Sequence, residues 1–324
     1  ADKISKNVFE QFNLDKRFTY KVKSIESVKD NDLNLIYIYH LDPVGYVLVS
    51  ADNRSEPYLG YSFQSNFKTT NMPQSFYSMF NNLKDLVKKP ITNNDLQTNN
   101  IKTLWNTYNT DNYRTREVRN VNPLIDAEFD QSGSWNDALS SFGFYGPVGC
   151  VAVSMSQIMH YWSYPESGIG SNTYVEDDYG SLTADFENAT YDFSSMAATY
   201  ATSPSKLLLH HTGISVNMDY DNSGSGAAVE GVYPSAEDAL VRYFKFSDDI
   251  QSVERDNYDN DTEFRAVLKE ELDNSRPILH SGYSNIDYDG GHAWNVDGYQ
   301  NNNMHCNWGW GGWNNGYYTV TSMM

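Results

Sequence analysis

The stretch that decides the fold is Val148-Gly149-Cys150-Val-Ala-Val-Ser-Met-Ser-Gln-Ile-Met-His-Tyr-Trp162. It is almost continuously apolar, which predicts a helix buried in a core, and Tyr164-Pro165 predicts its end. Cys150 opens this helix, so its sulfur would lie among free backbone N–H groups at the positive end of the helix dipole. That setting lowers the pKa of a thiol and favours a nucleophilic thiolate. A buried, inert cysteine is the alternative.

Two later segments contain residue types that a reactive cysteine needs. His292 lies in a glycine-flanked turn that enters a predicted strand, and a histidine brought near in space is the usual base for a thiol. Asn307-Trp308-Gly309-Trp310-Gly311-Gly312-Trp313 places an amide and three indoles in one glycine-rich turn. The amide can orient an imidazole while indoles exclude water. A structural histidine and an aromatic core plug are the alternatives.

The rest of the chain predicts two α+β units. In the first, alternating apolar residues predict an antiparallel meander, and apolar residues at helical spacing predict a helix over residues 75–89 that ends at Pro90. In the second, a helical layer precedes an antiparallel sheet. The remaining predicted elements are helices at 1–10 and 261–272 and strands at 20–25, 33–39, 45–50, 278–283, 291–299 and 317–320.

Length, charge and cysteine content exclude several classes of protein. The 324 residues predict two domains. The net charge of −19 argues against nucleic acid and anionic membranes as partners. Residues 1–120 carry 16 Lys and Arg against 13 Asp and Glu, a net charge of +3, whereas residues 121–324 carry 7 against 29, a net charge of −22. Cys150 and Cys306 are the only cysteines, too few for a disulfide scaffold or a thiolate zinc site.

The three segments together resemble the streptopain family, bacterial cysteine peptidases of papain-like fold that are made as zymogens. The strings that carry the resemblance are Gly149-Cys-Val-Ala-x-x-Met-x-Gln-Ile-Met159, Gly291-His-Ala-x-x-Val-Asp-Gly298 and Asn307-Trp-Gly-Trp-Gly-Gly312. The first half is similar to the propeptide of that family through Gly45-Tyr-Val-Leu-Val-Ser-Ala-Asp-Asn-Arg54 and Pro57-Tyr-Leu-Gly-Tyr-Ser62. The resemblance therefore covers nearly the whole chain.

The resemblance implies a role for each matching residue. Cys150 would be the nucleophile and His292 the general base and acid, with Asn307 and Trp308 orienting or shielding the histidine. The family places an oxyanion-stabilising glutamine upstream of the cysteine. Gln131 is the candidate here, although its context, Phe129-Asp130-Gln131, departs from the family pattern. Four further residues would line the substrate groove: Ser281, Gly282, Gly291 and Trp310.

The resemblance and the residues together predict a cysteine endopeptidase made as a zymogen. We expect an α+β fold in which an inhibitory prodomain at 1–119 precedes a papain-like catalytic domain of two subdomains at 120–324. Residues 90–119 are polar and predict an exposed linker, where proteolysis concentrates. The Arg119–Asn120 bond is a candidate for the activating cleavage.

Expected partners are protein or peptide substrates and the chain's own prodomain, with no nucleic acid, no membrane, no cofactor and no metal. The expected location is secreted or periplasmic. A catalytically silent papain-like binding or inhibitor protein is one alternative function, and a thiol amidase or transpeptidase is the other.

One segment resembles a metal site, contrary to the expectation that the chain binds no metal. Residues 219–230 place oxygen donors at positions 1, 3 and 5, glycine at position 6 and glutamate at position 12, as in a helix-loop-helix calcium site. Gly226 stands where such loops carry a large aliphatic residue, and strong helices do not flank the segment. The streptopain family has a similar stretch beside its substrate cleft, so we expect a cleft border rather than a calcium site.

Overall fold

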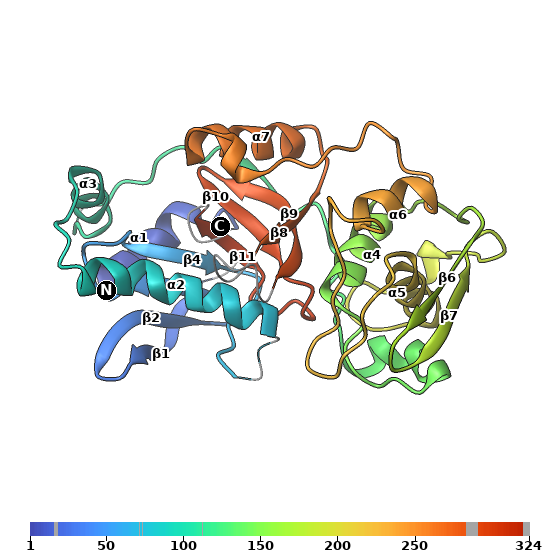
Figure 1. Cartoon of the computed structure of the whole chain (residues 1–324). Coiled ribbons are helices and arrows are strands. Elements are labelled where there is room, and N and C mark those ends of the chain that lie inside the picture. The colour runs from blue at the N-terminus through green and yellow to red at the C-terminus, as the bar shows by residue number, and fades with distance from the viewer. Residues whose placement is uncertain (16–18, 71, 73, 112, 283–290, 320–324) are drawn as a thin grey trace.

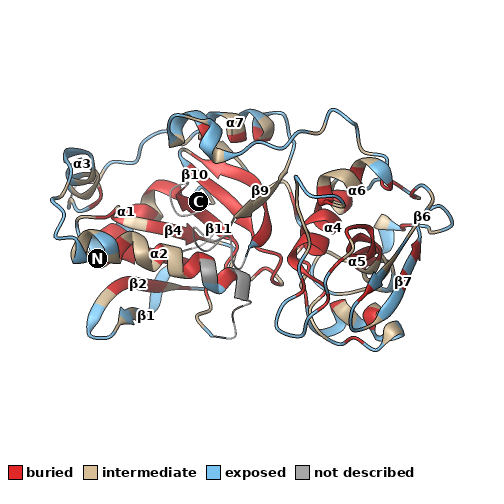
Figure 2. Cartoon of the chain, in the orientation of Figure 1, coloured by how far each residue is buried: buried red, intermediate tan, exposed pale blue. Residues whose placement is uncertain are grey.

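The computed structural model of the chain describes residues 1–15, 19–70, 72, 74–111, 113–282 and 291–319 (Figure 1). One side of the molecule consists of a large sheet with helices packed on it, and the other side is a mainly helical lobe. The buried residues concentrate in the sheet and in the central helices of that lobe (Figure 2). No described helix is long and apolar enough to cross a membrane.

The first unit is an antiparallel meander with helices packed against it, as predicted. Its first strand lies at the edge and has no buried residue, whereas the next three strands are largely buried, including all five residues of the third. The elements are α1 (Asp2–Phe12), β1 (Lys21–Asp30), β2 (Leu33–Asp42), β3 (Tyr46–Ser50), β4 (Tyr58–Ser62) and α2 (Gln74–Thr92).

One expectation for this unit is wrong, and one helix was not predicted. Helix α2 does not end at Pro90 but continues to Thr92. Proline lacks the N–H that would bond to the carbonyl of Leu86, and Ser55 Oγ donates to that carbonyl instead, at 3.0 Å. The predicted linker contains a helix, α3 (Asn99–Tyr108), whose Thr98 cap accepts from the backbone N–H of Ile101.

The second unit is divided between the helical lobe and the large sheet. The lobe contains η1 (Gly133–Phe142), α4 (Cys150–Trp162), η2 (Phe193–Ser195), α5 (Ser203–Ser215), α6 (Ala236–Arg242) and the hairpin of β6 (Ser171–Glu176) and β7 (Gly180–Asp185). The remaining elements are β5 (Asn120–Val121), η3 (Arg255–Asn257), α7 (Asp261–Asp273), β8 (Ile278–Gly282), β9 (His292–Gln300), β10 (Asn303–Asn307) and β11 (Gly316–Thr319).

Most of the elements predicted for this unit are present. The predicted helices at 148–162 and 261–272 and the three predicted strands correspond to α4, α7, β8, β9 and β11. Tyr283 and Val320, the last residues of two predicted strands, lie outside the described residues. The hairpin, α5, α6 and β10 were not predicted.

A single sheet joins the two units. Its strand order is β1-β2-β3-β4-β11-β10-β9-β5, and β8 pairs with β9. The junction is the antiparallel pair of β4 and β11, where Tyr61 lies opposite Tyr317 and Gly60 lies opposite Tyr318. A Cβ atom on Gly60 would lie 2.7 Å from the ring of Tyr318, so only glycine permits this approach.

We therefore predict that Gly60→Ala weakens the junction of the two units. In a Cys150→Ala background, which prevents self-cleavage, the substitution should lower the free energy of unfolding by about 1–3 kcal/mol because the tyrosine ring must shift. Denaturant unfolding measures this change. Gly224→Ala is the matched control, because a Cβ there meets nothing within 4 Å. Equal stability of both variants would contradict the prediction.

Candidate active site

The first turn of α4 places the thiol of Cys150 against the start of β9. Gly149 caps the helix with φ of +94°, and a Cβ there would lie 2.6 Å from Met218 Sδ, so the position requires glycine. The backbone N–H of Ala293 donates to Cys150 Sγ at 3.4 Å. Because Ala293 follows His292 directly, the cysteine and the histidine predicted from separate segments are brought together.

The pKa of the Cys150 thiol is raised rather than lowered, contrary to the expectation from the helix dipole. Burial is the main cause, since it penalises the charged thiolate. The backbone N–H groups of Ala293, Val151 and Cys150 itself oppose this effect without overcoming it. In this state of the full chain Cys150 is therefore a neutral thiol at neutral pH.

The imidazole of His292 is also neutral in this state. Burial lowers its pKa to about 3, and the backbone of Trp308 opposes this only in part. Within the described residues neither ring nitrogen has a hydrogen-bond partner of normal geometry. The ring lies parallel to the indole of Trp308, with 14° between the planes and 6.3 Å between the centroids.

Gln131 lies beside the start of α4, as an oxyanion donor must. Its backbone carbonyl accepts from the N–H of Val148, two residues before the cysteine, at 2.8 Å. Its side chain is buried, and among the described residues its Nε2 donates to no acceptor. A buried amide donor without a partner costs free energy unless a ligand supplies the acceptor.

Asn307 does not hydrogen-bond to His292 in this structure. Its Nδ2 donates to the carbonyl of Ala127, and its Oδ1 accepts from Gln157 Nε2 and from the backbone N–H of Gly309. The amide therefore braces the turn that follows β10. Of Asn307 and Trp308, it is Trp308 that lies against the imidazole ring of His292. The indole Nε1 of Trp308 donates to the carbonyl of Asn314.

The four predicted groove residues lie around the same region. Ser281 and Gly282 pair with Ala293 and His292 across β8 and β9. Gly291 is exposed immediately before His292. Trp310 is buried, and its ring centroid lies 5.7 Å from that of Phe76, a residue of α2.

Comparison with known proteins identifies the family. The sequence profile of the Peptidase C10 family matches residues 129–318, and that of the Spi protease inhibitor matches residues 1–87. The chain belongs to the Peptidase C10 family. It is similar to streptopain of Streptococcus pyogenes, with 26% identity over 93% of this chain and 79% of that protein. It is also 27% identical to the thiol protease/hemagglutinin PrtT of Porphyromonas gingivalis, over 85% of this chain and 32% of that protein.

Solved structures agree with the assignment of this C10 peptidase. A prointerpain A fragment of Prevotella intermedia matches with a TM-score of 0.71 and 26% identity, over 93% of this chain and 92% of that one. The active interpain A cysteine protease of the same organism matches with a TM-score of 0.53 and 30% identity, over 62% of this chain and 86% of that one. The predicted papain-like α+β fold and the cysteine peptidase class are thereby confirmed.

Sequence reasoning missed two residues that hold the site of this C10 peptidase together. Asn295 Nδ2 donates to Gln157 Oε1 at 2.8 Å, and Gln157 Nε2 donates in turn to Asn307 Oδ1 at 3.1 Å. These three buried amides connect α4, which carries Cys150, with β9, which begins at His292, and with β10, which Trp308 follows. A glutamine within an otherwise apolar helix was the available signal, because a buried amide needs partners.

The possible calcium segment folds as a turn of the lobe. Asp219 and Gly226 form a β-bridge, and Asp221 Oδ1 accepts from Ser223. Within the described ranges no group of three or more His, Cys, Asp or Glu side chains is arranged to hold a metal ion. No disulfide joins Cys150 to Cys306, which is buried in the sheet.

We predict that alkylation of Cys150 in the full chain is slow at neutral pH. Because burial raises the pKa of the thiol above its usual value near 9.0, the rate with iodoacetamide should rise about tenfold per pH unit up to at least pH 9. Mass spectrometry of the modified peptide measures the rate, with Cys150→Ser as the blank. A plateau reached below about pH 8 would show a stabilised thiolate and contradict the prediction.

Proposed function

We propose that Cys150 is the nucleophile and His292 the general base and acid of this cysteine peptidase. The contact between the N–H of Ala293 and Cys150 Sγ supports this assignment above all, because it holds the start of the helix against the start of the histidine strand. Since both groups are neutral in the full chain, activity requires a rearrangement that transfers the thiol proton to the imidazole.

The reaction then follows from these groups. The proton of Cys150 Sγ passes to His292, and the thiolate attacks the carbonyl carbon of the scissile peptide bond. Gln131 Nε2 and the backbone N–H of Cys150 donate to the oxygen as it becomes negative. His292 protonates the leaving amine, which leaves a thioester on Cys150. Water, deprotonated by His292, attacks the thioester, releases the acid and restores the thiol.

The roles of the neighbouring residues follow from their contacts. Trp308 shields His292 by lying parallel to its ring. Asn307 acts indirectly, as a positioning residue, through the amide network with Gln157. Ser281, Gly282 and Gly291 border the groove along which an extended substrate would lie.

We further propose that residues 1–119 inhibit the catalytic domain at 120–324 and that this peptidase is secreted. The pairing of β4 with β11 supports inhibition in cis, as does the contact of Phe76 with Trp308 and Trp310. Trp308 and Trp310 belong to the turn that shields the histidine. Protein substrates and the chain's own prodomain are the partners that this arrangement supports.

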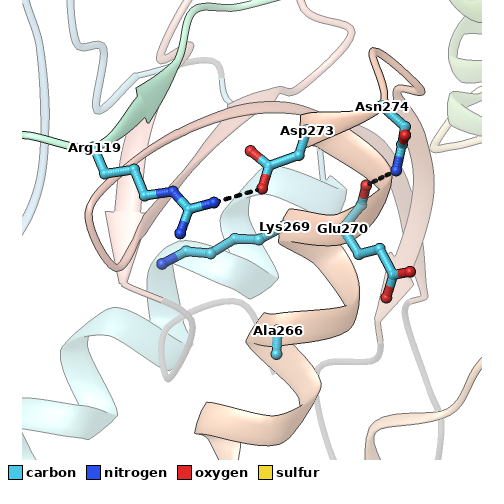
Figure 3. A pocket seen from close by; sticks show the side chains of 6 residues that line it. All are labelled: Arg119, Ala266, Lys269, Glu270, Asp273 and Asn274. Atoms are coloured by element: carbon cyan, nitrogen blue, oxygen red, sulfur yellow. Dashed lines mark hydrogen bonds and ion pairs between the residues drawn. The ribbon is translucent and has the colours of Figure 1, made fainter.

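We propose that the activating cleavage occurs at the residues just before the predicted Arg119–Asn120 bond rather than at that bond. Arg119 donates its N–H to Asn301 Oδ1 and accepts from the N–H of Asn301, and Asn120 pairs with β9. The guanidinium of Arg119 also forms an ion pair with Asp273 at 3.0 Å, in a shallow pocket beside α7 (Figure 3). A bond held on both sides is a poor protease substrate.

On each side of the segment Glu117–Val118, the backbone is held by hydrogen bonds to a residue distant in the sequence. Upstream, Gln11 Nε2 donates to the carbonyl of Arg116, and the N–H of Arg116 donates to Gln11 Oε1. Downstream, Asn301 holds Arg119 in the same way. The described part of the structure gives the backbone of Glu117 and Val118 no hydrogen bond, so a protease can bind this segment without breaking one.

We predict that activation produces a catalytic chain whose first residue is Glu117, Val118 or Arg119. The purified chain is incubated at neutral pH under reducing conditions, with and without a thiol-directed epoxide, and with Cys150→Ala alongside. Mass spectrometry and N-terminal sequencing follow the products. A first residue other than Glu117, Val118 or Arg119 would refute this location, and a start at Asn120 would favour the Arg119–Asn120 bond instead. An unchanged full-length chain that remains inactive on casein after trace protease treatment would instead favour a catalytically silent protein.

We also predict that Gln131→Ala lowers kcat about 100-fold to 1000-fold, because one oxyanion donor is lost. Gln131→Glu should be at least as impaired, since it replaces the donor with a negative charge. Alkylation of Cys150 in the processed form should remain fast in both variants. Hydrolysis at the wild-type rate would contradict the assignment of Gln131, and preferred transfer to added amines over water would favour the transpeptidase alternative.

A further inference from the structure

One lysine of the N-terminal unit is held by the turn that follows β10. The ammonium of Lys68 lies 3.6 Å from the ring centroid of Trp313 and 5.9 Å from that of Trp310. These distances are within the range of cation–π attraction. Among the described residues no carboxylate forms an ion pair with Lys68, so the two indoles are the groups that its charge contacts.

The backbone of the same lysine is held by one side chain. The N–H of Lys68 donates to Asn314 Oδ1 at 2.7 Å, and Asn314 Nδ2 donates to the carbonyl of Lys68 at 3.2 Å. The N–H of Asn314 donates in addition to the carbonyl of Asn66 at 3.0 Å. These bonds hold an extended segment through its backbone, which is how a groove holds chains of different sequence.

Asn314 is rigidly placed for this task. It is fully buried, and its carbonyl accepts from Tyr46 Oη, Trp308 Nε1 and Tyr318 Oη. Trp308 and Tyr318 belong to the C-terminal unit, so two of these three bonds persist when the N-terminal unit is removed. The amide therefore stays in place to hold another extended segment.

The same turn is bordered by negative charge. A Cβ on Gly311 would lie 2.8 Å from Asp130 Oδ2, and one on Gly312 would lie 2.7 Å from Glu128 Oε2. Both carboxylates are only partly buried, and they belong to the half of the chain that carries a net charge of −22. Their field favours a cationic side chain over a neutral or acidic one.

The turn lies beside the histidine of the proposed site. His292 protonates the leaving amine, so the substrate residues that follow the scissile bond pass this ring. Trp308 lies against His292, and Trp310 and Trp313 follow it in the same turn. A substrate chain continuing beyond His292 therefore reaches the indoles that Lys68 now occupies.

We propose that Trp310, Trp313 and Asn314 form a binding site for an extended segment that carries a lysine. In the full chain Lys68 fills this site. After removal of the N-terminal unit a lysine of the protein substrate, located after the scissile bond, replaces it. This inference rests on the proposed peptidase function and adds a preference for basic substrates on the leaving-group side.

The first test uses the processed enzyme and quenched fluorescent peptides. Lysine is compared with norleucine, which has a similar carbon chain without the charge, at each of the four positions after the scissile bond. We expect kcat/KM to favour lysine about threefold to tenfold at one position, as a cation–π contact predicts. Trp313→Leu should abolish this ratio and Trp313→Phe should retain most of it. A ratio near one at every position in an active enzyme would overturn the substrate part of the proposal.

The second test does not require activity. In the full-length Cys150→Ala chain, Lys68→Met should increase hydrogen exchange at the amides of residues 66–68. Lys84→Met is the matched control, because Lys84 also lies over aromatic rings, those of Tyr77 and Phe80, but within the N-terminal unit. Equal exchange in both variants would overturn the role of Lys68. Failure to cleave any peptide, with the Lys68 effect present, would refute the proposed function and leave the lysine site standing.

Discussion

The pairing of β4 with β11 is the interaction on which the rest of the architecture depends. It turns the meander of the N-terminal unit and the sheet of the peptidase into one nine-stranded sheet, so each half covers an edge that the other would expose. Two glycines make the close approach possible, because a Cβ on Gly60 or Gly316 would strike tyrosine atoms of the neighbouring strand. Of the described ion pairs, only Arg119 with Asp273 joins residues 1–119 to the rest, and both side chains are largely exposed. Backbone pairing and aromatic packing, rather than paired charges, therefore hold the two units together.

The proposed catalytic groups lie at the other end of this sheet, where three buried amides connect the helix of Cys150 to the strands. Asn295, Gln157 and Asn307 leave little freedom for α4 to move against β9. Such a network fixes positions but supplies no charge, and burial keeps both the thiol and the imidazole neutral. In the full chain this network thus surrounds a neutral thiol and a neutral imidazole, as an enzyme stored in inactive form requires.

Much of this arrangement could be predicted from the sequence. The apolar run after Gly149 and the alternating strands have periodic patterns, and Cys150 and His292 stand in motifs that a known family shares. Whether the pKa of the Cys150 thiol is raised or lowered could not be predicted, because it depends on how far the complete fold buries the sulfur. The continuation of α2 through Pro90 required Ser55, a residue distant in sequence, to satisfy the carbonyl of Leu86. The bonds of Asn307 likewise depend on tertiary contacts that no local pattern reveals.

The shared sheet also means that cutting the linker and freeing the enzyme are separate events. Before cleavage the inhibitor is tethered to its target, at an effective concentration that dilution cannot change. If the same strands stay paired after cleavage, the complex dissociates according to the total protein concentration. A freshly cut enzyme would thus be restrained where it is concentrated, near its source, and would gain specific activity as it disperses.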